Sequence, residues 1–204
     1  MTAYVRKTSF GEKTKQSFVD RLGIWLSRRA VRTAFGDVSE KSLGDFGCGF
    51  YGEFGSLFLN QVSKLYVADI SLSNDLKRGG KIVAIEGYLP QSLAEIESGT
   101  IDFILMNNIL EHLFNPVVIL KEAYRLLPEG GRLFLNVPSW RGKLFLETAA
   151  FRFGFSPAEE MNDHKMYYDP RDLWPLIVQA GFYPQNIKIA RHKFGLNTKA
   201  IVTK

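Results

Sequence analysis

A glycine-rich segment and an aspartate that follows it have the clearest capacity to bind a ligand. The segment DFGCGFYG places Gly47, Gly49 and Gly52 directly after an apolar run, where glycine lets the backbone turn sharply and approach a ligand. Asp69 closes the next apolar run, and a carboxylate there can accept hydrogen bonds from both hydroxyls of a ribose. Together they predict a site for a ligand that contains a nucleoside.

Asp45 bears on which nucleoside-containing ligand fits the site. By spacing alone, the three glycines also satisfy the G-x-G-x-x-G pattern of NAD-binding enzymes. A negative charge two residues before the first glycine would lie close to a pyrophosphate, whereas it suits the cationic amino group of S-adenosylmethionine. The sequence therefore favours S-adenosylmethionine, with an NAD-binding oxidoreductase as an alternative.

Proton transfer has three candidate residues, Glu111, His112 and His164. His112 is the first candidate for a general base, because an unperturbed imidazole titrates near pH 6.5 and can accept a proton at neutral pH. Glu111 can orient His112 or approach the cofactor, and each of the three can instead have a purely structural role. The residues lack the i, i+4 spacing of a helical metal site, so no metal is expected.

These residues need a scaffold that brings strand ends together. Short apolar runs alternate with helical patterns, which indicates an α/β fold with a mostly parallel sheet and helices on both faces. The five expected parallel strands are Lys41–Phe46, Lys64–Asp69, Lys81–Glu86, Ile101–Asn107 and Arg132–Val137. Helical patterns are expected at 17–35, 54–62, 72–76, 90–97, 115–127 and 169–180.

The end of the chain has a different pattern. Asn186–Phe194 and Thr198–Thr203 alternate apolar and polar residues around Gly195, which predicts an antiparallel hairpin and a total of seven strands. We expect a helical extension at 1–40 and one ligand-binding domain at 41–204, with a helical insertion at about 139–168. The insertion is rich in aromatic residues, which can line an acceptor pocket or pack as core.

Charge and composition restrict the classes of partner. The net charge of +5 comes from residues 1–40 and 185–204, since residues 41–184 hold more acidic than basic side chains. Such basic ends can face phosphate, although a solvated surface is the favoured explanation. No apolar run is long enough to span a membrane, residues 1–15 lack the apolar segment of a secretory signal, and Cys48 has no second cysteine to pair with. We therefore expect a cytoplasmic protein.

Read in order, the motifs resemble those of the class I S-adenosylmethionine-dependent methyltransferases, with a Rossmann-like sheet, and especially their small ubiquinone-biosynthesis-like branch. The resemblance runs from about Ser42 to Phe182. LGDFGCGFYG is similar to the family's glycine-rich motif and YVADIS to its acidic second motif. IDFILMNNILEHLFNP, LLPEGGRLFLNVPS and DHKMYYDPRDLWPLIVQAGF resemble its later strands and its late helix.

The resemblance implies S-adenosylmethionine as the cofactor and assigns contacts to it. Asp45, Gly47 and Gly49 would hold the methionine end, with Phe46 and Cys48 in the same turn; Asp69 and Ile70 would hold the ribose; Asn107 and Asn108 would form the floor of the site. The chain departs from the family's usual G-x-G-x-G, since Tyr51 stands at the third glycine. It also has Tyr88 where an acidic residue often binds adenine, so Glu86 and Tyr88 are weaker candidates.

These implications lead to an expected reaction and its alternatives. We expect methyl transfer to a small-molecule or sugar hydroxyl. Nucleic acid is disfavoured as the acceptor, because Asn108-Ile109-Leu110 lacks the two prolines of the motif typical of base amino methylation. A non-catalytic protein that keeps the fold is a further alternative, which the departures at Tyr51 and Tyr88 allow.

Overall fold

A seven-stranded sheet forms the centre of the computed structural model, which describes residues 8–12, 18–147 and 163–204. The strands lie in the order β3-β2-β1-β4-β5-β7-β6. Their bounds are β1 Ser42–Phe46, β2 Lys64–Asp69, β3 Ile82–Glu86, β4 Phe103–Asn107, β5 Arg132–Pro138, β6 Ile187–His192 and β7 Asn197–Thr203.

Pairing within the sheet follows the predicted pattern. β1 to β5 pair in parallel, and β7 lies antiparallel between β5 and β6. Asp45 pairs with Val67 and Leu105 on the two neighbouring strands, so the glycine turn after β1 lies at the carboxyl edge between β2 and β4. The predicted α/β fold, with a mostly parallel sheet that ends in an antiparallel hairpin, is confirmed.

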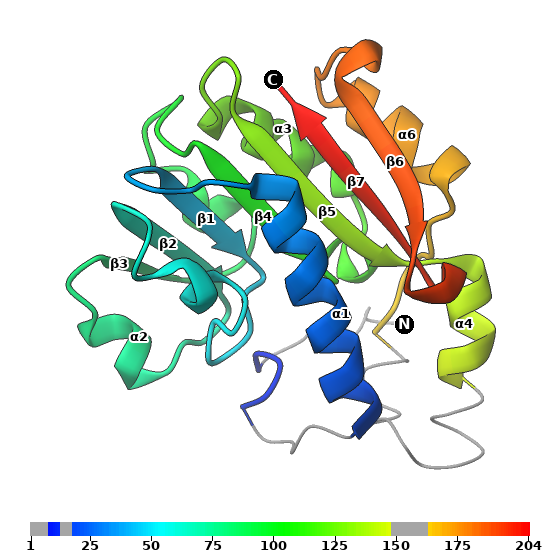
Figure 1. Cartoon of the computed structure of the whole chain (residues 1–204), viewed down its shortest axis with the longest axis horizontal. Helices are drawn as coiled ribbons and strands as arrows, with labels where there is room; N and C mark the ends of the chain where they lie inside the picture. The colour runs from blue at the N-terminus through cyan, green and yellow to red at the C-terminus, as the bar shows by residue number, and fades with distance from the viewer. Residues whose placement is uncertain (1–7, 13–17, 148–162) are drawn as a thin grey trace.

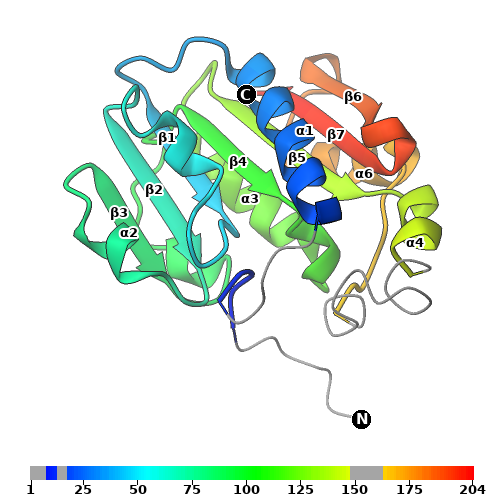
Figure 2. The same cartoon turned by 60° about the horizontal axis from the view of Figure 1, so that its bottom comes forward.

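Helices cover both faces of the sheet (Figures 1 and 2). On one face lies α1 (Phe18–Phe35), and on the other lie α3 (Pro116–Leu126) and α6 (Pro170–Gln179). Strand residues alternate between these faces. Leu65 and Val67 of β2 join the cluster that contains Val31 and Phe35 of α1, whereas their neighbours Tyr66 and Ala68 join the cluster that contains α3 and α6.

Two expected helices are shorter and tighter than the sequence pattern predicted. The segment after β1 contains only the 3₁₀-helix η1 (Gly55–Phe58), and the segment after β3 contains η2 (Gln91–Leu93). Gly52 and Gly55 lower the helix propensity after β1. Gly55 also packs against β1, because a Cβ added there would lie 3.0 Å from Oδ2 of Asp45.

The remaining helices are α2 (Asn74–Arg78) and α4 (Trp140–Glu147). The start of α6 follows the prediction, since the Asp172 carboxylate accepts a hydrogen bond from the Asp169 backbone N–H at 2.9 Å. α4 lies within the expected insertion at 139–168, but residues 148–162 are outside the described part. The proposed domain boundary at residue 40 stays a prediction. In the described part of the chain, no helix combines the length and apolarity that crossing a membrane requires.

Candidate functional site

The glycine turn after β1 has the backbone conformation that the sequence suggested. Gly47 and Gly49 have φ angles of 72° and 74°, in the left-handed region that favours glycine. A Cβ at Gly47 would also lie 2.8 Å from Cδ1 of Ile109, in the segment after β4. Substitution at Gly47 would therefore strain the backbone and clash with the Ile109 side chain.

Asp69, at the end of β2, is hydrogen-bonded directly to this turn. Its Oδ2 accepts a hydrogen bond from the Gly49 N–H at 2.7 Å, and its Oδ1 accepts one from the Ile70 N–H at 2.7 Å. Its Oδ1 also lies 2.5 Å from the hydroxyl of Ser9, a residue that the sequence analysis did not single out. The predicted pairing of the glycine turn with Asp69 is thus a direct contact.

Asp45 lies beneath the turn, with 1% of its surface exposed. Its Oδ2 accepts a hydrogen bond from the Gly55 N–H at 2.7 Å. Burial raises the pKa of Asp45 to about 7; the Gly55 hydrogen bond opposes this rise, and the charge of Asp69 adds to it. In this structure Asp45 ties β1 to the segment after the turn, and its direct contact with a cationic ligand stays a prediction.

Several other predicted cofactor contacts have protein partners. The Phe46 side chain is fully buried in the core, so only its backbone can meet a ligand. The Cys48 thiol is buried and bonds the Gly49 carbonyl at 3.3 Å, and burial raises its pKa. Oε1 of Glu86 accepts hydrogen bonds from the Leu72 N–H at 2.8 Å and from Lys77 at 2.9 Å. Both Glu86 and Tyr88 are exposed, Tyr88 at 53%.

Three asparagines meet at the ends of β4 and β5. Nδ2 of Asn136 donates hydrogen bonds to Oδ1 of Asn107 at 2.9 Å and to Oδ1 of Asn108 at 3.1 Å. Asn136 is fully buried, and its Oδ1 has no hydrogen-bond partner among the described residues. Sequence reasoning missed Asn136, although a lone amide within the apolar strand LFLNV was a visible signal.

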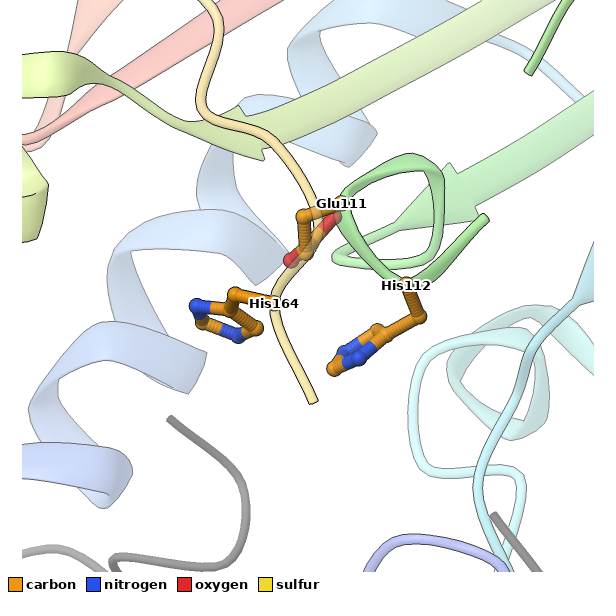
Figure 3. A group of neighbouring side chains, drawn as sticks. All are labelled: Glu111, His112 and His164. Carbon is orange, nitrogen blue, oxygen red and sulfur yellow. The ribbon is translucent and has the colours of Figure 1, made fainter. Parts of the chain in front are cut away.

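The three candidates for proton transfer converge although they lie on two segments (Figure 3). Glu111 and His112 belong to the 3₁₀-helix η3 (Leu110–His112) after β4, and His164 comes from the segment before α6. These segments are joined by a backbone hydrogen bond from the Lys165 N–H to the Glu111 carbonyl at 2.6 Å. The rings of His112 and His164 pack edge to face, with centroids 4.9 Å apart.

Asp163 is a partner of His112 that the sequence did not reveal as such. Nδ1 of His112 lies 2.9 Å from Oδ2 of Asp163, and Lys165 Nζ lies 2.6 Å from Oδ1 of the same carboxylate. Burial alone would raise the pKa of Asp163, but the hydrogen bonds from His112 and Lys165 outweigh it and lower that pKa below its ordinary value. A charged Asp163 can hold the proton of His112 on Nδ1 and leave Nε2 to accept another proton.

The same group offers ligand atoms of the kinds that bind divalent cations. One atom from each of Glu111, His112 and His164 lies within 4.8 Å of the others. Imidazole nitrogens and a carboxylate form a donor set that zinc accepts. Spacing within one helix gives no sign of this group, because its ligand atoms come from two separate segments.

Comparisons with known proteins agree with this architecture. A family model described as a methyltransferase domain matches residues 21–186. A ubiquinone biosynthesis O-methyltransferase from Xanthomonas oryzae pv. oryzae is 28% identical over 110 residues, which cover 49% of this chain and 44% of that protein. An uncharacterized 37.1 kDa protein in transposon TN4556 of Streptomyces fradiae is 28% identical over 134 residues, 61% of this chain and 39% of that protein. The matches thus span less than half the length of these two curated relatives.

Solved structures share the fold. A SAM-dependent methyltransferase from Archaeoglobus fulgidus has a TM-score of 0.65 and 16% identity, and the match covers 88% of this chain and 94% of that one. A second, from Mesorhizobium loti, has a TM-score of 0.63 and 12% identity over 86% and 96% of the two chains. Since the family model covers most of the chain, from α1 to the segment just before β6, this protein belongs to the methyltransferase-domain family that its sequence motifs resemble.

Proposed function

We propose that this chain transfers the methyl group of S-adenosylmethionine to a hydroxyl of a small molecule. The observation that carries the proposal is the hydrogen bond from the Gly49 N–H to Asp69. It joins the carboxylate proposed to bind the ribose to the glycine turn proposed to face the ligand. Membership of the methyltransferase-domain family supports the reaction class. The O-methyltransferase among the relatives supports oxygen as the methylated atom.

The residues present fit an adenosyl cofactor. Asp69 already accepts a hydrogen bond from a hydroxyl, that of Ser9, so its carboxylate is oriented toward a donor of the kind a ribose offers. Gly49 has no side chain of its own that would keep a ligand away from the backbone. Asp69, Ile70 and the turn at 47–49 would hold the nucleoside, while Asn107 and Asn108 would line the side of the site toward β4.

S-adenosylmethionine, when bound, supplies an electrophilic methyl group on a positively charged sulfur. The chain's own residues must then orient the acceptor hydroxyl and remove its proton. His112 accepts this proton on Nε2, while Asp163 holds the imidazole in place through Nδ1. Glu111, with 1% of its surface exposed, precedes His112 in η3 and would help to hold the imidazole in place.

Two other ligand classes serve as tests of this proposal. A pyrophosphate-containing cofactor would lie close to the Asp45 carboxyl, which repels it in its ionised form. Nucleic acid would use the basic ends of the chain as its contact surface.

A thermal-shift series tests the cofactor class directly. S-adenosylhomocysteine should raise the melting temperature, because a ligand that binds only the native state stabilises it, whereas NAD should not. Stabilisation by NAD alone would overturn the proposal. The acceptor class is then tested by measuring S-adenosylhomocysteine release from S-adenosylmethionine with a panel of phenols and sugars, and with transfer RNA; release with RNA alone would overturn the small-molecule assignment.

A further inference from the structure

Residues 8–12, which we call the N-terminal strap, lie against the site proposed for the cofactor. Figure 2 shows this short blue segment beside the carboxyl ends of β1 and β2. Ser9 is 4% exposed. Its hydroxyl lies 2.5 Å from Oδ1 of Asp69 and 2.7 Å from the Ser71 carbonyl, and it accepts a hydrogen bond from the Ser71 N–H at 2.9 Å. A serine hydroxyl has one proton, and the charged carboxylate is the stronger acceptor for it.

Ser9 occupies an acceptor position that a ribose would need. An ionised carboxylate has about four lone-pair positions, two on each oxygen. On Asp69, Ile70 and Ser9 fill both positions of Oδ1, and Gly49 fills one position of Oδ2. A ribose brings two hydroxyl donors and finds one position free. Departure of Ser9 would leave one position on each oxygen, which matches the two hydroxyls.

The backbone of the strap also covers the glycine turn. The Phe10 carbonyl accepts a hydrogen bond from the Phe50 N–H at 2.9 Å. The same carbonyl lies 3.2 Å from the position that a Cβ on Gly49 would take. The strap therefore fills the space in which the backbone at Gly49 would approach a ligand.

Glu12 holds the strap in this position without touching Asp69. Its Oε2 accepts a hydrogen bond from the Ser71 hydroxyl at 2.7 Å and one from the Ser9 N–H at 3.2 Å. Ser9 and Glu12 thus hold the strap through separate contacts. Ser9 contacts Asp69 at the end of β2, and Glu12 contacts Ser71 in the segment that follows.

We propose that the N-terminal strap is a built-in competitor of the adenosyl cofactor, which must displace Ser9 from Asp69 in order to bind. The inference rests on the proposed function and adds a closed state to it. Because only the fraction of molecules with the strap displaced can bind, the apparent affinity is the intrinsic affinity multiplied by that fraction. Substitutions that weaken the strap should tighten cofactor binding, which is the reverse of their effect if the strap closed over a bound cofactor.

Calorimetric titration with S-adenosylhomocysteine tests the direction in which these substitutions change the affinity. Ser9→Ala should lower the Kd by about 3- to 30-fold, because it removes a hydrogen bond to a charged group that binding must break. Glu12→Gln should lower it less, and Ser63→Ala, an exposed serine remote in sequence from the strap, should leave it unchanged. Hydrogen exchange of residues 8–12 should accelerate when S-adenosylhomocysteine is added to the wild type.

The outcomes separate the two proposals. An unchanged or higher Kd for Ser9→Ala, or slower exchange in residues 8–12 with ligand, would overturn the strap as a competitor. If the folded wild type and all variants fail to bind S-adenosylhomocysteine, the proposed cofactor is wrong, and this inference falls with it.

Discussion

Nδ1 of His112 and Oδ2 of Asp163 lie 2.9 Å apart, with 13% and 6% of their side chains exposed. A buried carboxylate on one imidazole nitrogen leaves the other nitrogen as the proton acceptor. His112→Ala should therefore lower turnover by about 100- to 10,000-fold, the usual worth of a general base. Calorimetry should show an unchanged Kd for S-adenosylhomocysteine, and a variant with full turnover on a hydroxyl acceptor would contradict this role.

Asp163→Asn keeps the size of the partner but removes its charge. The neutral amide no longer favours a proton on Nδ1 of His112, so turnover should fall and its dependence on pH should change, while His112 itself stays in place. A rate-against-pH profile, compared with that of Lys165→Met, measures the effect. Profiles identical in shape to the wild type would show that Asp163 has only a structural role.

The carboxylate of Asp69 should determine affinity for the nucleoside. Asp69→Asn keeps an oxygen that can accept from Gly49 but loses the charge, so the Kd for S-adenosylhomocysteine should rise by about 10- to 100-fold. Calorimetry gives the Kd, and the melting temperature of the free variant checks that the turn is intact. Unchanged affinity in a folded variant would place the ribose elsewhere.

Asp45 predicts a pH dependence of stability. Its pKa rises from 3.8 to about 7 on folding, so between these values the folded protein binds a proton that the unfolded chain has lost. Its contribution is full below pH 3.8 and is lost as the pH rises through 7. Asp45→Asn should remove on the order of 2 to 4 kcal/mol of this pH-dependent loss. Urea unfolding at pH 5 and pH 8 gives the free energy of unfolding at each pH. An equal change in this free energy between the two pH values in both proteins would contradict the prediction.

Chelation tests whether the group of Glu111, His112 and His164 works without a cation. We expect turnover to be unaffected by EDTA, because His112 removes the proton itself. Loss of turnover with EDTA and recovery with zinc would reassign His112 from base to ligand. His192→Ala, a histidine on β6 outside the group, controls for zinc bound elsewhere.

Local patterns accounted for most of the fold. The apolar run Lys64–Asp69 forms β2 with the bounds expected, and alternation around Gly195 marked the antiparallel hairpin. Prediction was weakest where two tendencies competed. The apolar residues at 54–62 have helical spacing, but Gly52 and Gly55 and the close approach of Gly55 to Asp45 leave only a short 3₁₀-helix.

The candidate site likewise contains residues that local patterns indicate and residues that they do not. Gly49 and Asp69 could be paired from the sequence because one follows a strand and the other ends the next, and parallel neighbours end at one edge. Ser9, Asn136 and Asp163 were not assigned roles, because their partners lie far away in the sequence and depend on how the chain returns to the sheet. Serines and aspartates are common outside active sites, so residue type alone does not distinguish them.

The hydrogen bond between Lys165 and Glu111 makes orientation of the imidazole depend on docking of the segment before α6. Strands β1, β2 and β4, which end by residue 107, carry the residues proposed to bind the nucleoside, whereas Asp163 lies on a later segment that docks onto η3. A chain with its sheet formed and this segment undocked would capture ligand while its imidazole remained unoriented. We therefore expect loss of this docking to impair the reaction more than cofactor binding.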